Sequence, residues 1–287
     1  MHQRNEAFQR MLDRARAARG VALMGICNVT PDSFSDGGRY LAPGAARQRV
    51  DQLIEEGVDV VDVGGESTRP GAQPVPAHEQ IARVRDVVRY AAGRGACVSV
   101  DTTNADVAAA CLEAGASAVN DVSCMRDPTL ADVVGAAGAA LVLMHARGTP
   151  EQMRGFGQYP PGGYADIVRD VCAEWESAAQ RASSRGVPRQ AMIMDPGLGF
   201  AKNAVHSAEL LARLAEIVAT VGVPVAVGAS RKSFLTLVDA AAAPTERLGA
   251  SVAAALHAAR AGAAVLRIHD VRATRQALDL VHRMGEG

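Results

Sequence analysis

Four polar side chains that directly follow short apolar runs have the chemistry to hold a flat, hydrogen-bonding ring. They are Asp101, Asn120, Asp195 and Lys232. A carboxylate can accept two neighbouring N–H hydrogens side by side, and an asparagine amide both donates and accepts. A 2-amino-4-oxo pyrimidine presents matching donors on one edge, and a lysine ammonium can donate to the carbonyl on the opposite edge. These residue types therefore predict a site for such a heterocycle.

Two apolar residues near the same chain positions could form the walls of this site. Met144 and Phe200 supply flat or adaptable apolar surface for a ring. Taken singly, Asp101 and Asp195 also have a structural interpretation, because Asp-Thr-Thr before a helix and Asp-Pro-Gly in a turn are typical caps. Ligand binding is favoured only if the separate groups converge in the fold.

A second set of residues has the chemistry to bind a pyrophosphate. Arg69, Arg267 and His269 offer an arginine fork and an imidazole, and Asn28 offers an amide. Pyrophosphate usually travels with Mg²⁺, which prefers oxygen ligands, so Oδ1 of Asn28 could be one of them. The structural alternatives are an internal ion pair for Arg267 and a turn cap for His269. For His145, which ends an apolar run, a structural role is at least as well supported as a catalytic one.

Lysine is scarce in this chain. Of 30 basic residues only Lys202 and Lys232 are lysines, and both follow apolar runs. A compact ammonium makes single-point contacts in a tight site that a guanidinium fork does not make. Chance and coding bias are the alternative explanation. The pattern favours a functional role for Lys232 over one for Lys202.

The elements that must position these groups alternate regularly along the chain. Eight short apolar runs each end abruptly in polar residues, and a stretch with helical spacing follows each run. The predicted strands are 21–27, 58–62, 98–100, 118–119, 141–144, 192–194, 225–227 and 264–268. The predicted helices are 45–56, 78–92, 105–114, 129–137, 164–185, 207–220, 247–261 and 272–284, with a further short helix possible at 7–18.

This alternation predicts the fold class. Strict strand–helix alternation indicates a parallel sheet, and eight repeats without a linker favour a (β/α)₈ TIM barrel over an open doubly wound sheet. We expect a single α/β domain at 21–287, with an N-terminal extension at 1–20. No Gly-x-Gly-x-x-Gly fingerprint follows the first strand. In such a barrel all eight polar strand ends meet at one mouth.

Composition limits the function classes. The chain has 287 residues, 48% of them apolar, and a net charge of −1, which argues against nucleic-acid or membrane-surface binding driven by charge. No apolar run approaches membrane-spanning length, and residues 1–20 lack the apolar stretch of a secretion signal. Five cysteines without paired spacing suit a reducing compartment, so we expect a cytoplasmic protein.

Two loops rich in Gly, Ser and Pro, at 30–39 and 64–76, are candidates for lids over the barrel mouth. Phe34 and Pro70 are their apolar points. The alternative is that both are ordinary surface loops. The density of specific polar groups between residues 28 and 38 favours the lid.

Five segments of the chain resemble signature motifs of the dihydropteroate synthases, the pterin-binding barrels of folate biosynthesis. They are Asn28-Val-Thr-Pro-Asp-Ser-Phe-Ser-Asp-Gly-Gly38, Asp62-Val-Gly-Gly-Glu-Ser-Thr-Arg-Pro-Gly71, Asp195-Pro-Gly-x-Gly-Phe200, Ser230-Arg-Lys-Ser233 and Arg267-Ile-His-Asp270. The resemblance runs from about residue 23 to residue 284. The length of the first two motifs makes it specific.

The resemblance implies a condensation of (7,8-dihydropterin-6-yl)methyl diphosphate with 4-aminobenzoate. By likeness to the family, the pterin is held by Asp101, Asn120, Asp195 and Lys232, the diphosphate by Arg267, His269 and a Mg²⁺ on Asn28, and the 4-aminobenzoate by Thr68, Arg69, Ser230, Phe34 and Pro70. Asp101, Lys232, Arg267 and His269 would be catalytic. The family likeness also implies a homodimer and competition by sulfonamides.

Three other functions are less consistent with the sequence. A methyltetrahydrofolate methyltransferase uses a similar barrel, but it is not expected to carry the 28–38 loop together with Ser230-Arg231-Lys232, and it needs a corrinoid partner. A zinc amidohydrolase is disfavoured because the first strand has no His-x-His pair. A paralogue that binds pterin without turnover is the non-enzymatic alternative. Its polar set would be expected to be incomplete.

Overall fold

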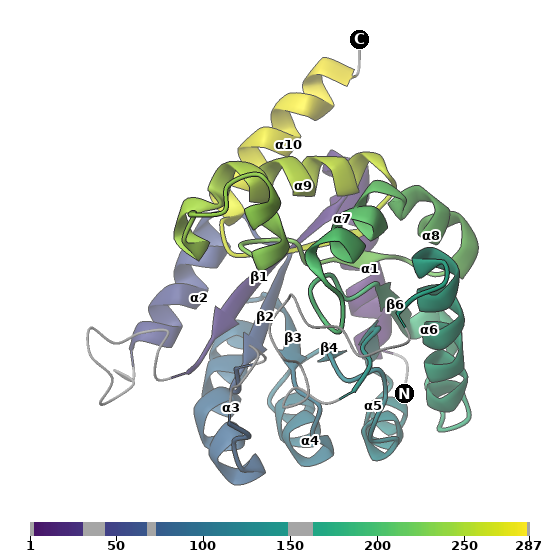
Figure 1. Cartoon of the computed structure of the whole chain (residues 1–287). Coiled ribbons are helices and arrows are strands. Elements are labelled where there is room, and N and C mark those ends of the chain that lie inside the picture. Colours follow the sequence, from purple (N-terminus) through teal and green to yellow (C-terminus); the bar gives the residue numbers. More distant parts are fainter. Residues whose placement is uncertain (1–2, 31–43, 68–72, 149–162, 286–287) are drawn as a thin grey trace.

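The chain forms an eight-stranded parallel barrel (Figure 1). A computed structural model describes residues 3–30, 44–67, 73–148 and 163–285. The strands are β1 (Ala22–Asn28), β2 (Val60–Gly64), β3 (Cys97–Asp101), β4 (Ala118–Asp121), β5 (Ala140–Met144), β6 (Met192–Asp195), β7 (Ala226–Val227) and β8 (Val265–Ile268). Their order is β6-β5-β4-β3-β2-β1-β8-β7, and a parallel bridge between Met194 and Val225 joins β6 to the start of β7. The predicted fold class is confirmed.

Helices surround the strands, as Figure 1 shows. They are α1 (Gln3–Arg19), α2 (Ala45–Glu55), α3 (Ala77–Gly93), α4 (Ala105–Glu113), α5 (Thr129–Ala137), α6 (Ile167–Ser183), α7 (Ala204–Ala212), α8 (Leu214–Val221), α9 (Leu248–Arg260) and α10 (Val271–Gly285). Most bounds lie within three residues of the predicted ones. The alternation of apolar runs and helical stretches was therefore a sound guide to the elements.

One predicted helix is wrong, because the stretch 207–220 forms two helices that meet at Arg213. This residue has φ −98° and ψ 20°, outside the helical region. The buried stripe of Leu210, Leu214, Ile217 and Val221 continues across the break, which is why periodicity alone predicts one helix. At the break, the guanidinium of Arg213 lies between the carboxylates of Asp166, Glu209 and Glu216.

Two apolar layers hold the barrel together. Side chains that point outward from the strands pack against the surrounding helices in one large cluster. Side chains that point inward at the amino-terminal end of the strands pack against α1, through Phe8, Met11, Leu12 and Ala15. Both faces of each strand are thus buried, which explains the nearly continuous apolar runs in the sequence. Helix α1 shares one core with the barrel interior.

The strands continue further than the apolar runs predict, so several polar residues lie inside the sheet. The run 58–62 predicted a strand that ends at Asp62, whereas β2 ends at Gly64. Strand ladder bonds pair Asn28 with Gly64, Gly64 with Asp101, and Asp101 with Asn120. A barrel interior can hold polar residues within a strand because their backbone groups remain paired in the ladder. This row is the floor of the candidate site.

Candidate active site

The ladder places Asn28, Gly64, Asp101 and Asn120 side by side at the carboxyl ends of β1 to β4. Gly64 leaves a gap between its two neighbours. A Cβ atom at Gly64 would lie 3.4 Å from Cβ of Asp101 and 3.5 Å from Oδ1 of Asn28. Two oxygen-bearing side chains therefore flank an opening that any larger residue at position 64 would fill.

A buried ion pair crosses the barrel from β8 to β2 and β3. Nε of Arg267 donates to Oδ2 of Asp62 at 2.7 Å, and Nη2 donates to Oδ2 of Asp101 at 2.6 Å. Asn120 Nδ2 also donates to Oδ2 of Asp62, at 3.3 Å. The side chain of Asp62 is fully buried and that of Arg267 is 19% exposed. The internal ion pair that was the structural alternative for Arg267 is thus present.

This ion pair controls the charge at the mouth. Burial raises the pKa of Asp101, and the Arg267 guanidinium opposes that rise. The carboxylates of Asp62 and Asp101 take the N–H of Nε and one N–H of Nη2, so Nη1 and the second hydrogen of Nη2 can still donate to a diphosphate while both ion pairs persist. Arg267, which was predicted to bind the diphosphate, therefore also influences the ionisation of Asp101, which was predicted to bind the ring.

Lys232 approaches the same interior from the segment after β7. Its Nζ donates to the carbonyl oxygen of Leu198 and lies 4.6 Å from the centre of the Phe200 ring. A Cβ atom at Gly228 would lie 3.8 Å from Nζ of Lys232 and 3.7 Å from Cβ of Arg267, so the two cations lie on either side of a glycine. Burial lowers the pKa of Lys232 to about 8, although Asp195 opposes this.

Asp195 ends β6 and begins the loop that carries Phe200. Oδ1 of Asp195 accepts a hydrogen bond from the backbone N–H of Gly197 at 2.7 Å, as the cap interpretation expected. Burial raises the pKa of Asp195, and the nearby Lys232 ammonium opposes this. Met144 is paired with Asp195 in the ladder and is buried beneath the loop at Gly197. The Asp195 carboxylate thus stabilises the turn through its hydrogen bond with Gly197 and also interacts electrostatically with the Lys232 ammonium.

Ser230 and His269 meet across the ends of β7 and β8. Ser230 Oγ lies 3.1 Å from His269 Nδ1 and accepts from the backbone N–H of His269 at 3.2 Å. Burial lowers the pKa of His269 to about 3, and Arg267 adds to the effect. In the free protein His269 is therefore neutral at pH 7. Its imidazole can then donate or accept a hydrogen bond at the ends of β7 and β8.

Known proteins share much of this sequence. The sequence pattern of pterin binding enzymes matches residues 24–269. A dihydropteroate synthase from Mycobacterium leprae is 45% identical over 267 residues, which cover 91% of this chain and 92% of that protein. The chain belongs to the dihydropteroate synthase family. The resemblance found in the motifs and the predicted transferase class are confirmed.

Solved structures of the family share the fold. A dihydropteroate synthase from Xanthomonas albilineans with 4-aminobenzoic acid is 38% identical, with a TM-score of 0.85, over 93% of this chain and 94% of that one. One from Yersinia pestis, in a sulfonamide drug complex, is 36% identical with the same TM-score, over 93% and 95%. These relatives favour the synthase over the methyltransferase alternative.

Four predicted site residues lie outside the described part of the chain. They are Phe34, Thr68, Arg69 and Pro70, from the two loops that were predicted to act as lids. The ten remaining predicted residues lie at strand ends or in the segments that directly follow them: Asn28, Asp101, Asn120, Met144, Asp195, Phe200, Ser230, Lys232, Arg267 and His269. These ten residues thus lie toward the carboxyl ends of the strands.

Sequence reasoning missed the role of Asp62. The motif 62–71 that begins with this residue indicates the family, but its pattern indicates no role for the carboxylate. The signal was present, because a charged residue within Val60-Val61-Asp62-Val63 interrupts a buried parallel strand, and buried carboxylates are seldom unpaired. The identity of its partner, Arg267, could be learned only from the fold.

His145 has the structural role that its isolated position suggested. The imidazole is fully buried, and its Nε2 lies 3.0 Å from Oε2 of Glu174 on α6. Burial lowers the pKa of His145 to about 4, and the nearby Lys202 adds to this. His145 is therefore neutral in the native protein at neutral pH.

This burial makes stability depend on pH. An unfolded histidine gains its proton near its ordinary pKa of about 6.5, whereas the folded His145 gains it only near pH 4. The unfolded state therefore binds more protons as the pH falls between these values, so the native state loses stability. We expect the unchanged chain to lose roughly 2 kcal/mol more than a His145→Gln variant between pH 7 and pH 5. Urea unfolding at both pH values measures this, and equal losses would contradict it.

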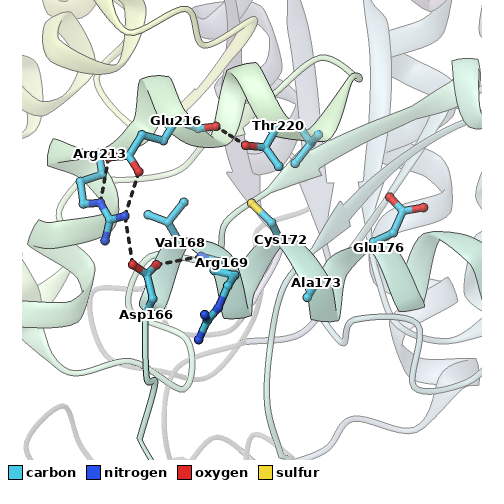
Figure 2. Close-up of a pocket in the computed structure, with 10 residues that line it drawn as sticks. Asp166, Val168, Arg169, Cys172, Ala173, Glu176, Arg213, Glu216 and Thr220 are labelled. Atoms are coloured by element: carbon cyan, nitrogen blue, oxygen red, sulfur yellow. Dashed lines mark hydrogen bonds and ion pairs between the residues drawn. The ribbon is translucent and has the colours of Figure 1, made fainter.

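A separate cleft lies on the outer surface between α6 and α8 (Figure 2). It has a volume of about 530 Å³ and is lined by residues such as Cys172, Glu176 and Thr220, with Arg213 and Asp166 at one end. None of the candidate site residues lines it. The cleft is therefore distinct from the barrel mouth.

The described residues contain neither a membrane-spanning helix nor an enclosed metal cluster. In that part of the chain no helix combines the length and apolar character that a membrane crossing requires. Within the same residues, no three His, Cys, Asp or Glu side chains are grouped as they would be in a protein-enclosed metal site.

Proposed function

We propose that the barrel mouth condenses (7,8-dihydropterin-6-yl)methyl diphosphate with 4-aminobenzoate, to give 7,8-dihydropteroate and diphosphate. The observation that carries this proposal is the convergence of groups from distant strands. Arg267 links Asp62 and Asp101, Lys232 lies beside Arg267 across Gly228, and Asn28 borders Asp101 at Gly64. Relatives of this chain are dihydropteroate synthases, and one was solved with 4-aminobenzoic acid.

In this proposal the pterin ring lies between the β3–β4 side and the β6–β7 side of the mouth. Asp101, Asn120 and Asp195 accept from the ring N–H and amino groups, and Lys232 donates to its carbonyl. Met144 and Phe200 provide apolar surface. Lys232 is directed by the Leu198 carbonyl and the Phe200 ring, so its ammonium is partly oriented before a ligand binds.

The residues at Gly64 suit a Mg²⁺ ion that arrives with the diphosphate. Asn28 Oδ1 borders the opening at Gly64, with the Asp101 carboxylate on the other side. Oxygen ligands, few protein contacts and room for water or phosphate are what Mg²⁺ prefers. Asn28 would hold the ion, which when bound would neutralise charge on the leaving diphosphate. Arg267 and neutral His269 would contact the diphosphate oxygens.

The chemistry follows from these placements. The C–O bond between the pterin methylene and the diphosphate breaks, and the positive charge that develops is shared with the electron-rich pterin. The ionised Asp101, buried near this position, stabilises that charge. The free aryl amine of 4-aminobenzoate attacks the methylene and then loses a proton, so no strong general base is required. Ser230, and the undescribed Thr68, Arg69, Phe34 and Pro70, are proposed to shape the 4-aminobenzoate site.

A diphosphate-release assay tests the reaction. We expect diphosphate release to require the pterin diphosphate and Mg²⁺, and to produce dihydropteroate when 4-aminobenzoate is present. Asn28→Ala should raise the Mg²⁺ concentration needed for half-maximal rate about tenfold or more, since few protein ligands hold the ion. Absence of product would contradict the proposed activity, whereas an unchanged Mg²⁺ requirement would contradict only the role of Asn28.

Sulfonamides should compete with 4-aminobenzoate. A Yersinia pestis relative was solved in a sulfonamide drug complex. We therefore expect a sulfonamide to raise the KM for 4-aminobenzoate while the maximal rate stays the same. Turnover that is indifferent to the drug at low 4-aminobenzoate would overturn this part of the proposal.

A homodimer is proposed from family likeness and from one exposed apolar surface. Val205 on α7, Val238 at the end of η4 (Ser233–Leu237) and Leu248 on α9 are 63%, 78% and 42% exposed. Both η4 and α9 contact α7, so these side chains occupy neighbouring elements. Val238→Glu should convert dimer to monomer in light-scattering measurements. A monomeric unchanged chain would rule the dimer out.

The cytoplasmic location also stays a proposal. All five cysteines are unpaired, and four of them are buried. Free thiols in this number suit a reducing compartment.

A further inference from the structure

Lys202 is a buried lysine to which the proposed mechanism assigns no role. Its side chain is only 2% exposed, at the end of the loop between β6 and α7. Nζ of Lys202 donates to the carbonyl oxygen of Gly197 at 3.1 Å and to that of Phe200 at 3.0 Å, and it lies 2.8 Å from Nδ1 of His145. An ammonium group thus occupies the inside of the loop and binds its backbone.

The hydrogen bonds indicate the protonation state of this lysine. Glu174 is ionised at neutral pH, because its hydrogen bonds with Arg147 and His145 lower its pKa to about 2 despite burial. Nε2 of the neutral His145 must therefore donate to Glu174, which leaves Nδ1 as an acceptor. Lys202 then donates to His145 Nδ1 and to the carbonyls of Gly197 and Phe200, with the His145 carbonyl as a fourth, longer contact at 3.5 Å, and three donated bonds require –NH₃⁺. Burial lowers the pKa of Lys202 to about 7, and Asp195 opposes this.

The loop that Lys202 holds has an unusual backbone. Gly197, Gly199 and Ala201 all have positive φ, at +69°, +77° and +48°. A Cβ atom at Gly197 would lie 2.0 Å from the carbonyl oxygen of His145, so the loop lies directly against the end of β5. A non-glycine residue such as Ala201 adopts this conformation only at a cost, and surrounding contacts must compensate. The Lys202 ammonium provides such contacts on both sides of the loop.

The same loop carries groups that orient Lys232. The Leu198 carbonyl accepts from Nζ of Lys232, and the Phe200 ring lies beneath that nitrogen. Lys202 binds the carbonyls of Gly197 and Phe200, which flank Leu198 along the chain. A shift of these carbonyls would move the two features that align Lys232.

We propose that Lys202 is a positioning residue for pterin recognition: its buried ammonium fixes the Gly197–Phe200 loop and thereby aligns Lys232 with the ring carbonyl. This inference rests on the proposed function, because it takes Lys232 as a pterin contact. Lys202 itself does not touch the ligand. His145 and Glu174 connect it to the end of β5 and to α6.

The test measures pterin affinity on folded protein. Lys202→Met keeps the length of the side chain but removes all three donors. It should weaken binding of 6-hydroxymethylpterin about tenfold or more. The KM for 4-aminobenzoate should change less than about threefold. Lys202→Gln keeps two N–H donors and provides a milder variant should Lys202→Met fail to fold. It should weaken binding about threefold or more. Affinity unchanged in either folded variant overturns the proposal.

A matched control separates positioning from general loss of stability. A Cβ at Gly135 on α5 would lie 2.8 Å from the backbone of Gly186, and none of the atoms it would meet belongs to the Gly197–Phe200 loop, so Gly135→Ala should destabilise the fold by steric overlap. We expect its folded fraction to bind the pterin with unchanged affinity. If Gly135→Ala weakens binding as much as Lys202→Met does, the effect is not specific to the loop and the proposal fails.

A double-mutant cycle tests the route through Lys232. Because Lys202 acts by aligning Lys232, the double variant Lys202→Met/Lys232→Met should bind the pterin no more than about threefold more weakly than Lys232→Met alone. If the two substitutions weaken pterin binding by independent factors that multiply, Lys202 does not act through Lys232 and the proposed route is wrong. If Lys232→Met leaves binding unchanged, the proposed ring site itself has failed. If only the Lys202 variants have no effect, the ring site stands and the positioning role is lost.

Discussion

Replacing Asp101 with asparagine is expected to lower kcat about 100-fold or more, while pterin affinity changes less than about tenfold. Asparagine keeps the size of the side chain and one acceptor, but it lacks the charge that faces the developing cation. In the structure Arg267 fixes this carboxylate at 2.6 Å. Diphosphate release measures kcat, and calorimetry with 6-hydroxymethylpterin measures the affinity. Unchanged turnover would remove Asp101 from its role.

The pH dependence of the same variant provides a second check. Burial raises the pKa of Asp101, so its carboxylate takes up a proton at a higher pH than an ordinary aspartate. If the ionised form is required, kcat/KM for the pterin substrate should fall as the pH drops through this raised pKa. Asp101→Asn should lack that acid limb. Asp106→Asn, an exposed aspartate on α4, is the matched control and should behave as the unchanged chain does.

Arg267→Met is expected to lower the free energy of unfolding by about 3–5 kcal/mol at pH 7. The substitution leaves the fully buried Asp62 and the nearly buried Asp101 without their shared cation. Methionine fills part of the volume, so the loss arises mainly from the uncompensated carboxylates. Urea unfolding of the two proteins measures the difference.

A surface arginine provides the control for this loss. Arg185 pairs with Asp132 at 2.8 Å, but both side chains are nearly half exposed, so Arg185→Met should cost less than about 1 kcal/mol. The loss in Arg267→Met should also shrink at pH 5. Burial raises the pKa of Asp101, and loss of the opposing Arg267 guanidinium would raise it further, so protonation of Asp101 at lower pH restores stability. Equal losses for the two arginines would contradict the buried pair.

The sequence by itself determined the barrel fold and most of the polar residues at the ends of its strands. The apolar runs arise because each strand is buried on both faces, and the helical stretches that alternate with them cover the strands. Both patterns involve residues that are close together in the sequence. Asp101, Asn120, Asp195 and Lys232 were identified because polar groups end these runs. The long motifs around Asn28 and Asp62 then indicated the family, which the relatives confirm.

Only the tertiary structure decided which of these groups act on one another. Arg267 binds Asp62 and Asp101, which are 205 and 166 residues away, so no local pattern could pair them. The neutral state of His269 and the three donated bonds of Lys202 depend on burial and on partners from other strands. Charge state and pairing are through-space properties, because desolvation and Coulomb energy depend on distance in the folded state and hardly at all on position along the chain.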